Sequence, residues 1–501
     1  MNNRRKELIT AVLVFAAAIL LAMNTTRYFG RIDMTETKSF TISSTTKDYI
    51  KTIPEQVNIT YFISDKIRNI APAAGQIEDL LFEYAANSRG HISTTSVDPS
   101  KNVMEAYAKK MGITAQQVEI YDRNELAYST VFSGILIQYL DKTSAIPFIL
   151  DPSNLEYEVS SKIQKLVENT TTRIGLLTGN TINTVDYYYS YLSETMKNNG
   201  EVIDVPVGKP LDPELSVLFV LGGKDLTDGD LLYIDEFIMG GGRTIFTLDG
   251  VEVDMSNNLK ATKLEDNPAI QMLKKWGITI NNDMVLDKYC KKITMKGSLP
   301  MNYPMWLSVN SKYVNKDNPI TAAFASLDMM WASSIAVEPV PGLEYQELFS
   351  STEESWVLSD YITGNPYEAF TTQNIVPESK GSHPLCYAVT GQFPSAFTDK
   401  VSRDTKIIVA SDADFLSNLI EYTDSPANLM FAENMIQWLD NDRFMNIKTR
   451  NVRDIRLSKI TDLSSRVKAI FAVYLVNIFI IPCGIIVYGI VRYIRRKRKD
   501  A

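Results

Sequence analysis

Two long apolar stretches without charged residues lie near the ends of the chain. The first covers residues 8–26 and the second covers residues 469–491, a run of 23 residues. At about 1.5 Å per residue, a helix of the second length extends roughly 34 Å, enough to cross the hydrocarbon core of a bilayer. The pattern therefore predicts a transmembrane helix at each end. A cleaved signal peptide is the alternative for the first stretch, and a buried core helix is the alternative for the second.

Basic residues flank both stretches on their outer sides. Three of them lie in residues 1–7, and a basic tail occupies residues 492–501. Because cytoplasmic flanks are enriched in Lys and Arg, both termini are expected in the cytoplasm, at a cell membrane, with the main body extracytoplasmic. Between residues 28 and 467 there are 40 Lys/Arg and 57 Asp/Glu residues, a charge near −17. Such an acidic body argues against nucleic acid as a partner.

Residues 27–170 alternate between strand patterns and helix patterns. In 55–64, Val57, Ile59 and Tyr61 alternate with polar neighbours, which indicates a strand with one buried face. The alternation predicts an α/β domain, thioredoxin-like in its order. Its further expected strands are 91–99, 129–139 and 144–150, and its expected helices begin at Ser43 or Ser44 and cover 77–86, 103–111 and 155–169.

Residues 171–445 predict a second α/β domain, whose short apolar strands alternate with amphipathic helices. Continuous apolar strands separated by helices are typical of a doubly wound, flavodoxin-like parallel sheet. The stretch 251–400 is less periodic and is expected to be an irregular insertion, and 446–468 connects the body to the second span. The expected strands are 173–179, 201–207, 216–223, 243–250 and 406–416, and the expected helices are 185–200, 228–242 and 428–442.

Polar residues and glycines follow the predicted parallel strands of the second domain. Ligands of open α/β sheets bind beyond the carboxyl ends of the strands, so these residues are candidates for a polar ligand site. The alternative is that the glycines only make turns and the aspartates only cap helices. The candidate residues are Thr178, Gly179, Asn180, Gly222, Gly223, Asp249, Asp412 and Asp414, with Lys224 and Gly250 beside them.

Other patterns carry weaker signals. Asp412 and Asp414 resemble a metal-binding pair, but they lack a third ligand or a nearby histidine, so no metal or other cofactor is predicted. His383 lies close to Cys386, but this spacing is more typical of a turn histidine and a buried thiol than of a nucleophile. No nucleotide-binding or hydrolase motif is present, and the three cysteines form no CxxC.

A tyrosine run opens the helix expected at 185–200. Tyr187, Tyr188, Tyr189 and Tyr191 cannot all face inward on one helix. An adhesive surface for a partner or sugar is possible, whereas ordinary packing with two solvent-facing rings is the simpler interpretation.

Segments spread over nearly the whole chain carry a resemblance to a known family. They are FGRIDMTETKSFTISSTTKDYIKTI, RIGLLTG, DEFIMGGGRTIFTLD, YPMWLSVN, SHPLCYAVTGQFPSAF, VASDADFL, ENMIQWLDND and the C-terminal span with its basic end. In these segments the chain resembles the GldG-like family, the auxiliary component of gliding-motility-type ABC transport systems. The resemblance implies a non-catalytic membrane subunit that works beside an ABC permease and an ABC ATPase, with a glutamine-amidotransferase-like or intraflagellar-transport-like second domain used without catalysis.

The second span is the expected contact with the permease, because small residues and a proline allow close or kinked helix packing. The residues concerned are Asn477, Pro482, Gly484 and Gly489. Two alternatives to a transporter subunit stay open at this point: an anchored extracellular enzyme that uses Asp412 and Asp414, and a stand-alone surface receptor for a polar ligand.

Overall fold

The computed structural model describes residues 41–447, apart from 69–70, 102–103, 123–124, 180–182, 295–298, 322–325, 361, 372–378, 424–426, 441–442 and 445–446. Both predicted spans lie outside the described residues, as do the termini, Asn180 and the residues expected to contact a permease, Asn477, Pro482, Gly484 and Gly489. Within the described part of the chain, no helix combines the length and the apolar character needed to cross a membrane.

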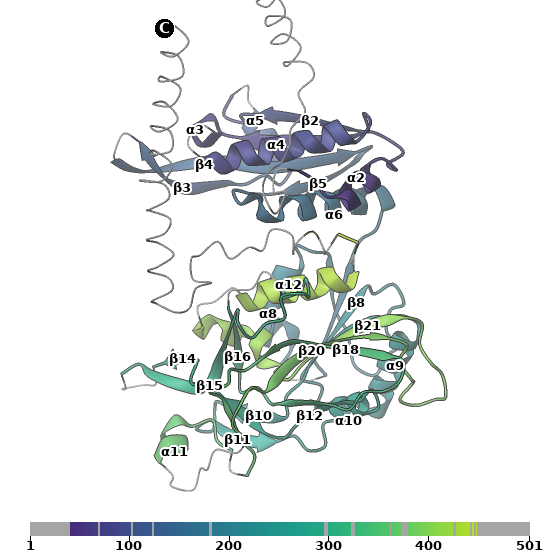
Figure 1. Cartoon of the computed structure of the whole chain (residues 1–501), viewed down its shortest axis with the longest axis vertical. Helices are drawn as coiled ribbons and strands as arrows, with labels where there is room; N and C mark the ends of the chain where they lie inside the picture. The colour runs from purple at the N-terminus through teal and green to yellow at the C-terminus, as the bar shows by residue number, and fades with distance from the viewer. Residues whose placement is uncertain are drawn as a thin grey trace, which may run out of the picture. The chain divides into compact units, whose positions relative to one another are not determined.

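The first domain is a mixed sheet with helices, as the alternating pattern predicts (Figure 1). Its strands follow the order β2-β1-β4-β3, and β5 also pairs with β4. β1 and β2 are parallel, whereas β4 is antiparallel to β1, β3 and β5. The elements are α2 (Ser44–Ile50), β1 (Val57–Ile63), α3 (Asp65–Arg68), α4 (Pro72–Asn87), β2 (Ile92–Val97), α5 (Met104–Lys110), β3 (Ala115–Asp122), β4 (Glu125–Tyr139), β5 (Lys142–Ile146), the 3-10 turn η1 (Pro152–Asn154) and α6 (Leu155–Glu168).

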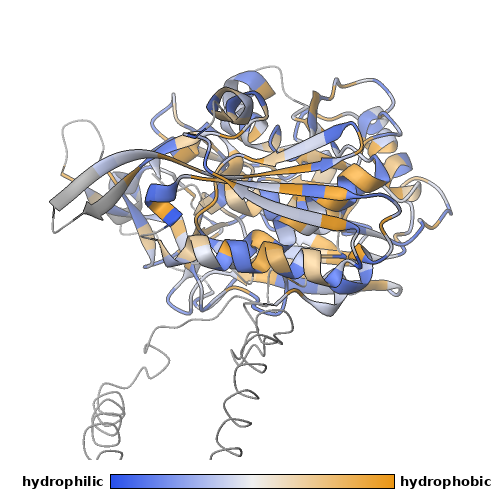
Figure 2. Cartoon of the chain, turned by 90° about the horizontal axis from the view of Figure 1, so that it is seen from above, coloured by the Kyte–Doolittle hydropathy of each residue, from blue (hydrophilic) through white to orange (hydrophobic). Residues whose placement is uncertain are grey.

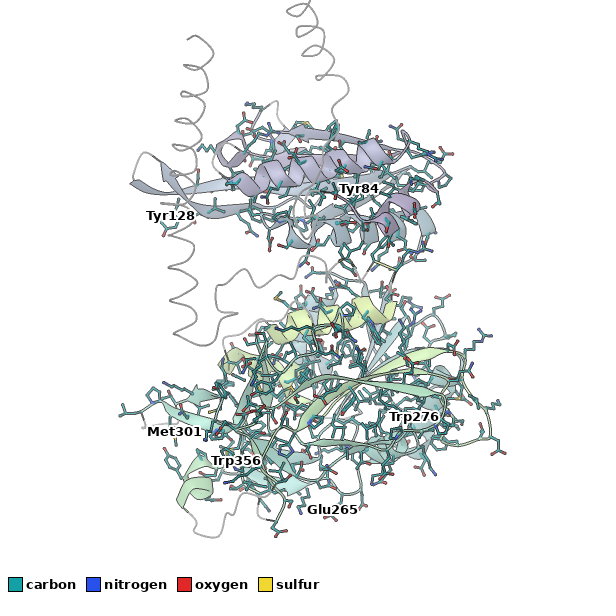
Figure 3. All side chains as sticks on the ribbon, viewed as in Figure 1. Tyr84, Tyr128, Glu265, Trp276, Met301 and Trp356 are labelled. Carbon is teal, nitrogen blue, oxygen red and sulfur yellow. The ribbon has the colours of Figure 1, made fainter. Side chains whose placement is uncertain are left out.

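Local sequence explains most of these elements. The Ser43 hydroxyl accepts a hydrogen bond from the Thr46 amide (3.1 Å) and so begins α2. The alternating residues of β1 are buried in one apolar cluster with α4 and α6. Tyr84 lies on α4 (Figure 3), and its hydroxyl donates to the Glu156 carbonyl of α6 (2.8 Å), which joins the two helices. Hydrophobic and polar residues interleave along the helices, as amphipathic packing requires (Figure 2).

One strand of the first domain begins with residues that carry no alternating pattern. β3 pairs with β4 from Ala115 opposite Phe132 to Asp122 opposite Glu125. Its start contains Gln116 and Gln117, whereas Val118 packs against the apolar cluster of β1 and α4. Backbone pairing in a hairpin therefore supports a segment whose first residues give no strand signal.

The second domain is built on one seven-stranded sheet of order β18-β20-β21-β9-β8-β6-β7. Five strands are parallel, and β20 and β18 extend the sheet in antiparallel pairing. The strands are β6 (Arg173–Leu177), β7 (Glu201–Asp204), β8 (Val217–Leu221), β9 (Arg243–Thr247), β18 (Leu343–Ser350), β20 (Pro384–Gly391) and β21 (Thr405–Ala410).

Helices cover both faces of this sheet. Ile245 of β9 packs in the same apolar cluster as Met435, whereas the next residue, Phe246, packs in the cluster of Ile234 and Trp276. Because successive side chains of a strand point to opposite faces, the two clusters lie on opposite sides of the sheet. The helices are α8 (Ser190–Met196) and α12 (Ala427–Asp440) on the first side, and α9 (Asp228–Met239) and α10 (Pro268–Lys274) on the second.

The insertion is more regular than its sequence suggests. Its strands β18 and β20 belong to the main sheet, although the pattern predicts an irregular elaboration for 251–400. A register shift between Glu347 and Phe349 interrupts the alternation of β18, which lies at the sheet edge with Glu344 exposed. Further elements are β10 (Val251–Asp254), β11 (Lys260–Lys263), β12 (Ile278–Ile280), β13 (Met284–Leu286), β14 (Cys290–Ile293), β15 (Met301–Asn310), β16 (Ser326–Met330), β17 (Ile335–Val337), β19 (Trp356–Leu358) and α11 (Pro366–Thr371).

The helix expected over 185–200 is interrupted. It forms α7 (Val185–Tyr188) and then α8, with Tyr189 between them at φ −124° and ψ 27°. The break leaves the Tyr189 ring buried in the core and directs the Tyr188 hydroxyl to Asp414. The interruption of the helix thus accompanies two placements: the Tyr189 ring is buried, and the Tyr188 hydroxyl bonds to Asp414.

Candidate functional site

The carboxyl ends of neighbouring parallel strands meet at one edge of the second-domain sheet. Leu177 of β6 is paired with Val220 of β8, and Leu221 of β8 is paired with Thr247 of β9. The residues that follow these strands enclose a small cavity of ≈ 30 Å³, room for about one or two water molecules. We call this the strand-end pocket, and it is lined by Thr178, Asn183, Tyr189, Leu221, Gly222, Gly223, Lys224, Asp249, Glu252, Leu264 and Asp414.

The structure thus brings together five of the eight candidate residues: Thr178, Gly222, Gly223, Asp249 and Asp414. Asn180 lies outside the described residues, and Gly179 and Asp412 do not line the pocket. The five candidate residues that line the pocket meet there because they follow neighbouring parallel strands, an arrangement that the sequence predicts.

The glycines lie in the turns that follow the strands and allow the backbone conformation of these turns. Gly179, Gly222 and Gly223 all have positive φ, between 62° and 80°, a conformation that residues with side chains rarely adopt. A Cβ on Gly179 would lie 2.6 Å from Leu226 Cδ2, so this glycine is required for packing as well. The space around the Gly222 Cα is open.

Asp249 and Asp414 supply two carboxyl groups to the pocket wall. Both are only partly exposed. Oδ1 of Asp249 accepts a hydrogen bond from the Ala413 amide (2.7 Å), and Oδ1 of Asp414 accepts one from the Tyr188 hydroxyl (2.8 Å). Burial, and then the charge of Asp414, raise the pKa of Asp249 well above its usual value. Burial raises the pKa of Asp414 to about 6, although the Tyr188 hydrogen bond opposes this rise.

Asp412 has a structural position. Its side chain is fully buried, Oδ1 accepts from the Phe415 amide (3.0 Å), and Oδ2 accepts from the Met330 amide. The carboxyl group therefore links the end of β21 to β16. Burial raises its pKa well above the usual value, and the neighbouring Asp414 and Asp249 add to that rise. Among the described residues, no three His, Cys, Asp or Glu side chains are placed to hold a metal ion.

Two further charged residues of the pocket form an ion pair. Lys224, from the turn after β8, bonds to Glu252 of β10. The sequence gives no signal for Glu252, because it belongs to the insertion and its place depends on how β10 packs. Tyr188 and Tyr189 belong to the tyrosine run, but nothing in that run predicts their approach to Asp414 and Asp249.

The tyrosine run divides as the simpler interpretation predicts. Tyr187 and Tyr191 are exposed, at 72% and 42%, and Tyr189 is buried at 3%. His383 and Cys386 also show ordinary contacts. A ring nitrogen of His383 bonds to the Ser379 carbonyl (2.8 Å), while Cys386 is fully buried in the core, where burial raises the pKa of its thiol.

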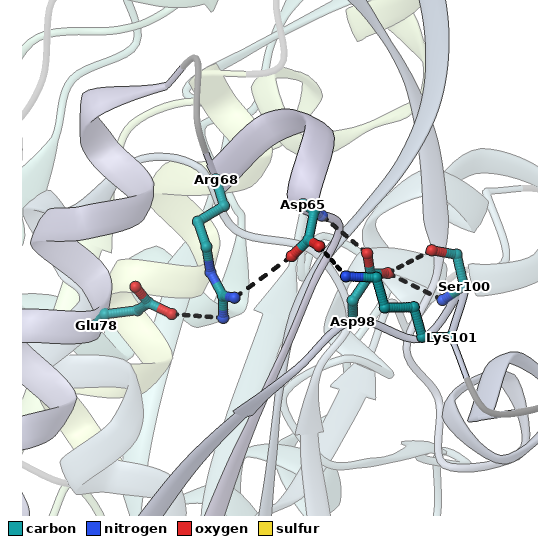
Figure 4. Close-up of polar contacts among 6 residues, drawn as sticks. All are labelled: Asp65, Arg68, Glu78, Asp98, Ser100 and Lys101. Atoms are coloured by element: carbon teal, nitrogen blue, oxygen red, sulfur yellow. Dashed lines mark hydrogen bonds and ion pairs between the residues drawn. The ribbon is translucent and has the colours of Figure 1, made fainter.

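A second polar cluster lies in the first domain (Figure 4). Arg68 bonds to Asp65 (3.4 Å) and to Glu78 (2.8 Å), and Lys101 bonds to Asp65. Oδ2 of Asp98 accepts from the Asp65 amide (3.0 Å), and its Oδ1 accepts from Ser100. We call these residues, Asp65, Arg68, Glu78, Asp98, Ser100 and Lys101, the first-domain network. Its cations and its hydrogen-bond donors engage every carboxylate in it, so the network joins α3 to the loop after β2.

The second domain matches a known protein family. Residues 171–447, more than half of the chain, match the family described as an ABC-type uncharacterized transport system, auxiliary component. The chain belongs to this family. This confirms the resemblance to a GldG-like auxiliary component, and a transport-associated accessory role follows from it. Residues 36–138 match a domain of unknown function.

A relative of full length is also known. An uncharacterized protein of Borreliella burgdorferi is 28% identical over 510 residues, which cover 100% of each chain. Among solved structures, the N-terminal domain of mmIFT52 is similar to 53% of this chain and 99% of its own, with 15% identity and a TM-score of 0.33. A ThuA-like protein from Bacteroides uniformis is similar to 54% of this chain and 91% of its own, with 11% identity and a TM-score of 0.30. Scores this low support no assignment of activity.

Proposed function

We propose that this protein is a non-catalytic auxiliary membrane subunit of an ABC transporter. The observation that carries the proposal is the match to a family of auxiliary ABC transport components. The matched residues, 171–447, include the whole seven-stranded sheet and the strand-end pocket. The protein takes no part in ATP hydrolysis itself, and a separate ABC ATPase drives transport through a separate permease. The order of elements supports a thioredoxin-like first domain and a flavodoxin-like second domain.

The body works outside the cytoplasm in this proposal. The uncharged segments 8–26 and 469–491 anchor it in the cell membrane, and the basic ends keep both termini in the cytoplasm. The second span docks on the permease through Pro482, Gly484 and Gly489, which allow kinked or close packing, and through the polar side chain of Asn477.

The strand-end pocket is the proposed recognition site for a polar group of the substrate or of an envelope partner. Support comes from its position, because ligands of open α/β sheets lie beyond the carboxyl ends of the strands. Its candidate contacts are Thr178, Gly222, Gly223, Asp249 and Asp414.

Purification of the tagged full-length chain in mild detergent tests this function. We expect a multi-span permease and an ABC ATPase to copurify with it. Both should be lost when residues 469–491 are replaced by an unrelated span of equal length, and a Gly484→Leu/Gly489→Leu variant should weaken the association. As a matched control, Leu475→Ile changes an apolar residue of the same span without changing its volume. Recovery of the chain alone would overturn the proposal and would favour an anchored enzyme or a stand-alone receptor.

A further inference from the structure

A cavity much larger than the strand-end pocket lies beside α6. Its volume is ≈ 1030 Å³, which is at the upper end of the range for small-molecule binding sites. One compact unit contains both domains, and the cavity wall comes from β5 and α6 of the first domain and from α12 and the turn before β7 of the second. Lys165 of α6 joins the two sides, because its ammonium group donates to the Asn199 carbonyl (3.4 Å). We call this space the α6 cavity.

Lys162 is the unusual residue of this wall. It lines the cavity and is mostly buried, yet no other described residue forms a hydrogen bond or an ion pair with it. By contrast, Lys165 of the same helix donates to the Thr172 hydroxyl (2.8 Å) and forms an ion pair with Asp440 (3.7 Å). Burial lowers the pKa of the Lys162 ammonium group, Glu158 opposes this shift, and Lys165 adds to it. A mostly buried cation without a partner costs free energy, which an anion in the cavity would offset.

A second lysine of the wall has no acidic partner among the described residues. Lys142 of β5 donates to the side-chain amide oxygen of Asn169, which is a neutral group. Lys197 also lines the cavity, but it forms an ion pair with Glu194 (2.8 Å). Lys142 and Lys162 therefore bring positive charge that no contact with a described carboxylate neutralises. Ammonium groups of this kind bind phosphate and carboxylate oxygens through charge-assisted hydrogen bonds.

The rest of the wall is rich in hydroxyl, amide and carboxylate groups. Thr143 and Ser144 come from β5, and Gln437 comes from α12. Glu158 of α6 and Glu433 of α12 supply carboxylate oxygens, which accept hydrogen bonds. Carboxylates repel a bare anion, whereas they accept hydrogen bonds from the hydroxyl groups of a sugar. The wall therefore fits a ligand that has an anionic group at one place and hydroxyl groups elsewhere.

We propose that the α6 cavity binds an anionic sugar, a carbohydrate that carries a phosphate or a carboxylate group. Lys162 donates to the anionic group, Lys142 adds positive charge to the same cavity, and the polar side chains of the wall bond to the sugar hydroxyls. The inference goes beyond the proposed function, because it involves neither the strand-end pocket nor a contact with a permease.

Competitive acetylation of the full-length chain in detergent tests the site, with glucose 6-phosphate and glucuronate as probes. Acetic anhydride reacts with the neutral form of a lysine amine. A bound oxyanion favours the charged form of Lys162 and covers it, so a saturating probe should lower the acetylation of Lys162 several-fold. Lys209, an exposed lysine outside the cavity, is the internal control and should react equally with and without the probe. Mass spectrometry measures both residues. If neither probe protects Lys162, the proposal is wrong.

Two further probes separate the charge from the sugar. Glucose lacks the anionic group, so it should not protect Lys162 at a concentration at which the anionic sugars do. Inorganic phosphate lacks the sugar hydroxyls, so it should protect Lys162 less than glucose 6-phosphate does. Equal protection by glucose would contradict the role of Lys162 in binding an anion, and equal protection by inorganic phosphate would show that the cavity takes a bare oxyanion instead of a sugar. Stronger protection by one of the two anionic sugars supports the proposal and identifies its charged group.

Lys162→Met removes the charge of this side chain and keeps most of its length. Isothermal titration calorimetry with the protecting sugar should give binding about tenfold weaker, or weaker still, than in the native chain. Lys162→Arg keeps a positive charge and should bind the sugar more tightly than Lys162→Met. Lys209→Met, the same change at an exposed position, is the matched control and should bind as the native chain does. Native binding by Lys162→Met would overturn the site. These outcomes do not depend on whether a permease copurifies, so the inference and the proposed function can fail separately.

Discussion

The two polar clusters of this protein use similar residues in opposite ways. In the first-domain network, Arg68 and Lys101 engage Asp65, and Arg68 also engages Glu78. In the strand-end pocket, the bonded cation pairs with Glu252, whereas Asp249 accepts from a backbone amide and Asp414 accepts from a phenol. The comparison shows that the balance of charges around the carboxyl groups distinguishes a structural cluster from a candidate functional one, because uncompensated charge in a closed site costs free energy.

Among the substitutions that test this comparison, the largest loss of stability is expected at Asp412. Asp412→Ala leaves the Met330 and Phe415 amides buried without an acceptor, which should cost about 3 kcal/mol of stability. Urea unfolding of the full-length chain measures the change. Asp399→Ala, at an exposed position, is the control and should change stability little. If both variants unfold at the same urea concentration, the Asp412 carboxyl does not hold β21 to β16.

The pH dependence of the two domains should differ in sign. The pKa of Asp414 is raised, so the second domain should gain about 1 kcal/mol between pH 7.5 and pH 5.5. Burial raises the pKa of Asp98 in the first domain, but hydrogen bonds from Ser100 and the Asp65 amide outweigh burial and lower this pKa below its usual value. The first domain should therefore lose stability only as pH falls below about 4, where Asp98 becomes protonated.

Hydrogen exchange of peptides from each domain checks this difference in one sample of the full-length chain. The first domain serves as the internal control between pH 7.5 and pH 5.5. A parallel change in both domains over that range would show that the pocket carboxyls have no special role.

Lys224→Met tests whether the ion pair limits repulsion in the pocket. Without Lys224, Glu252 becomes a further uncompensated carboxylate beside Asp249, and the second domain should lose up to about 1 kcal/mol at pH 7.5. The loss should be smaller at pH 5.5, where the aspartates hold more protons. Thermal melting at the two pH values measures it, and Lys224→Arg, which keeps the charge, should behave as the native chain. A loss of the same size at both pH values contradicts the electrostatic explanation.

The smallest effect is expected at Lys101. This side chain is well exposed, at 63%, and its ion pair with Asp65 is screened by water and salt. Lys101→Ala should melt within the scatter of the native measurement, as should Lys109→Ala, which removes a similarly exposed pair on α5. A clearly larger change for Lys101→Ala would show that the first-domain network is more than a set of surface contacts.

Much of the fold could be predicted from periodicity. The apolar residues of β1 and the inward residues of α9, Leu231, Ile234 and Ile238, are buried as their spacing indicates. β3 and β18 could not be predicted in the same way. The first depends on a partner strand, and the second lies at an edge where a register shift interrupts the alternation.

The candidate site could be predicted only in part. Parallel strand order places Thr178, Gly222 and Asp249 at one edge, so the rule for open sheets finds them from the sequence. The same rule includes Asp412, because sequence does not show that two backbone amides occupy its oxygens. Glu252 comes from the insertion, so its position depends on packing that no local pattern encodes.

The sequence by itself determined the α/β class, the apolar segments at both ends, the acidic body and the resemblance to an auxiliary ABC component. These features depend on local spacing, composition and charge, which can be read along one chain. Only the tertiary structure decided which aspartates share a cavity and that α7 ends where Tyr188 reaches Asp414. Contacts between residues more than 200 positions apart arise from how the strands are ordered in the sheet, and the burial they create sets the pKa values of the site.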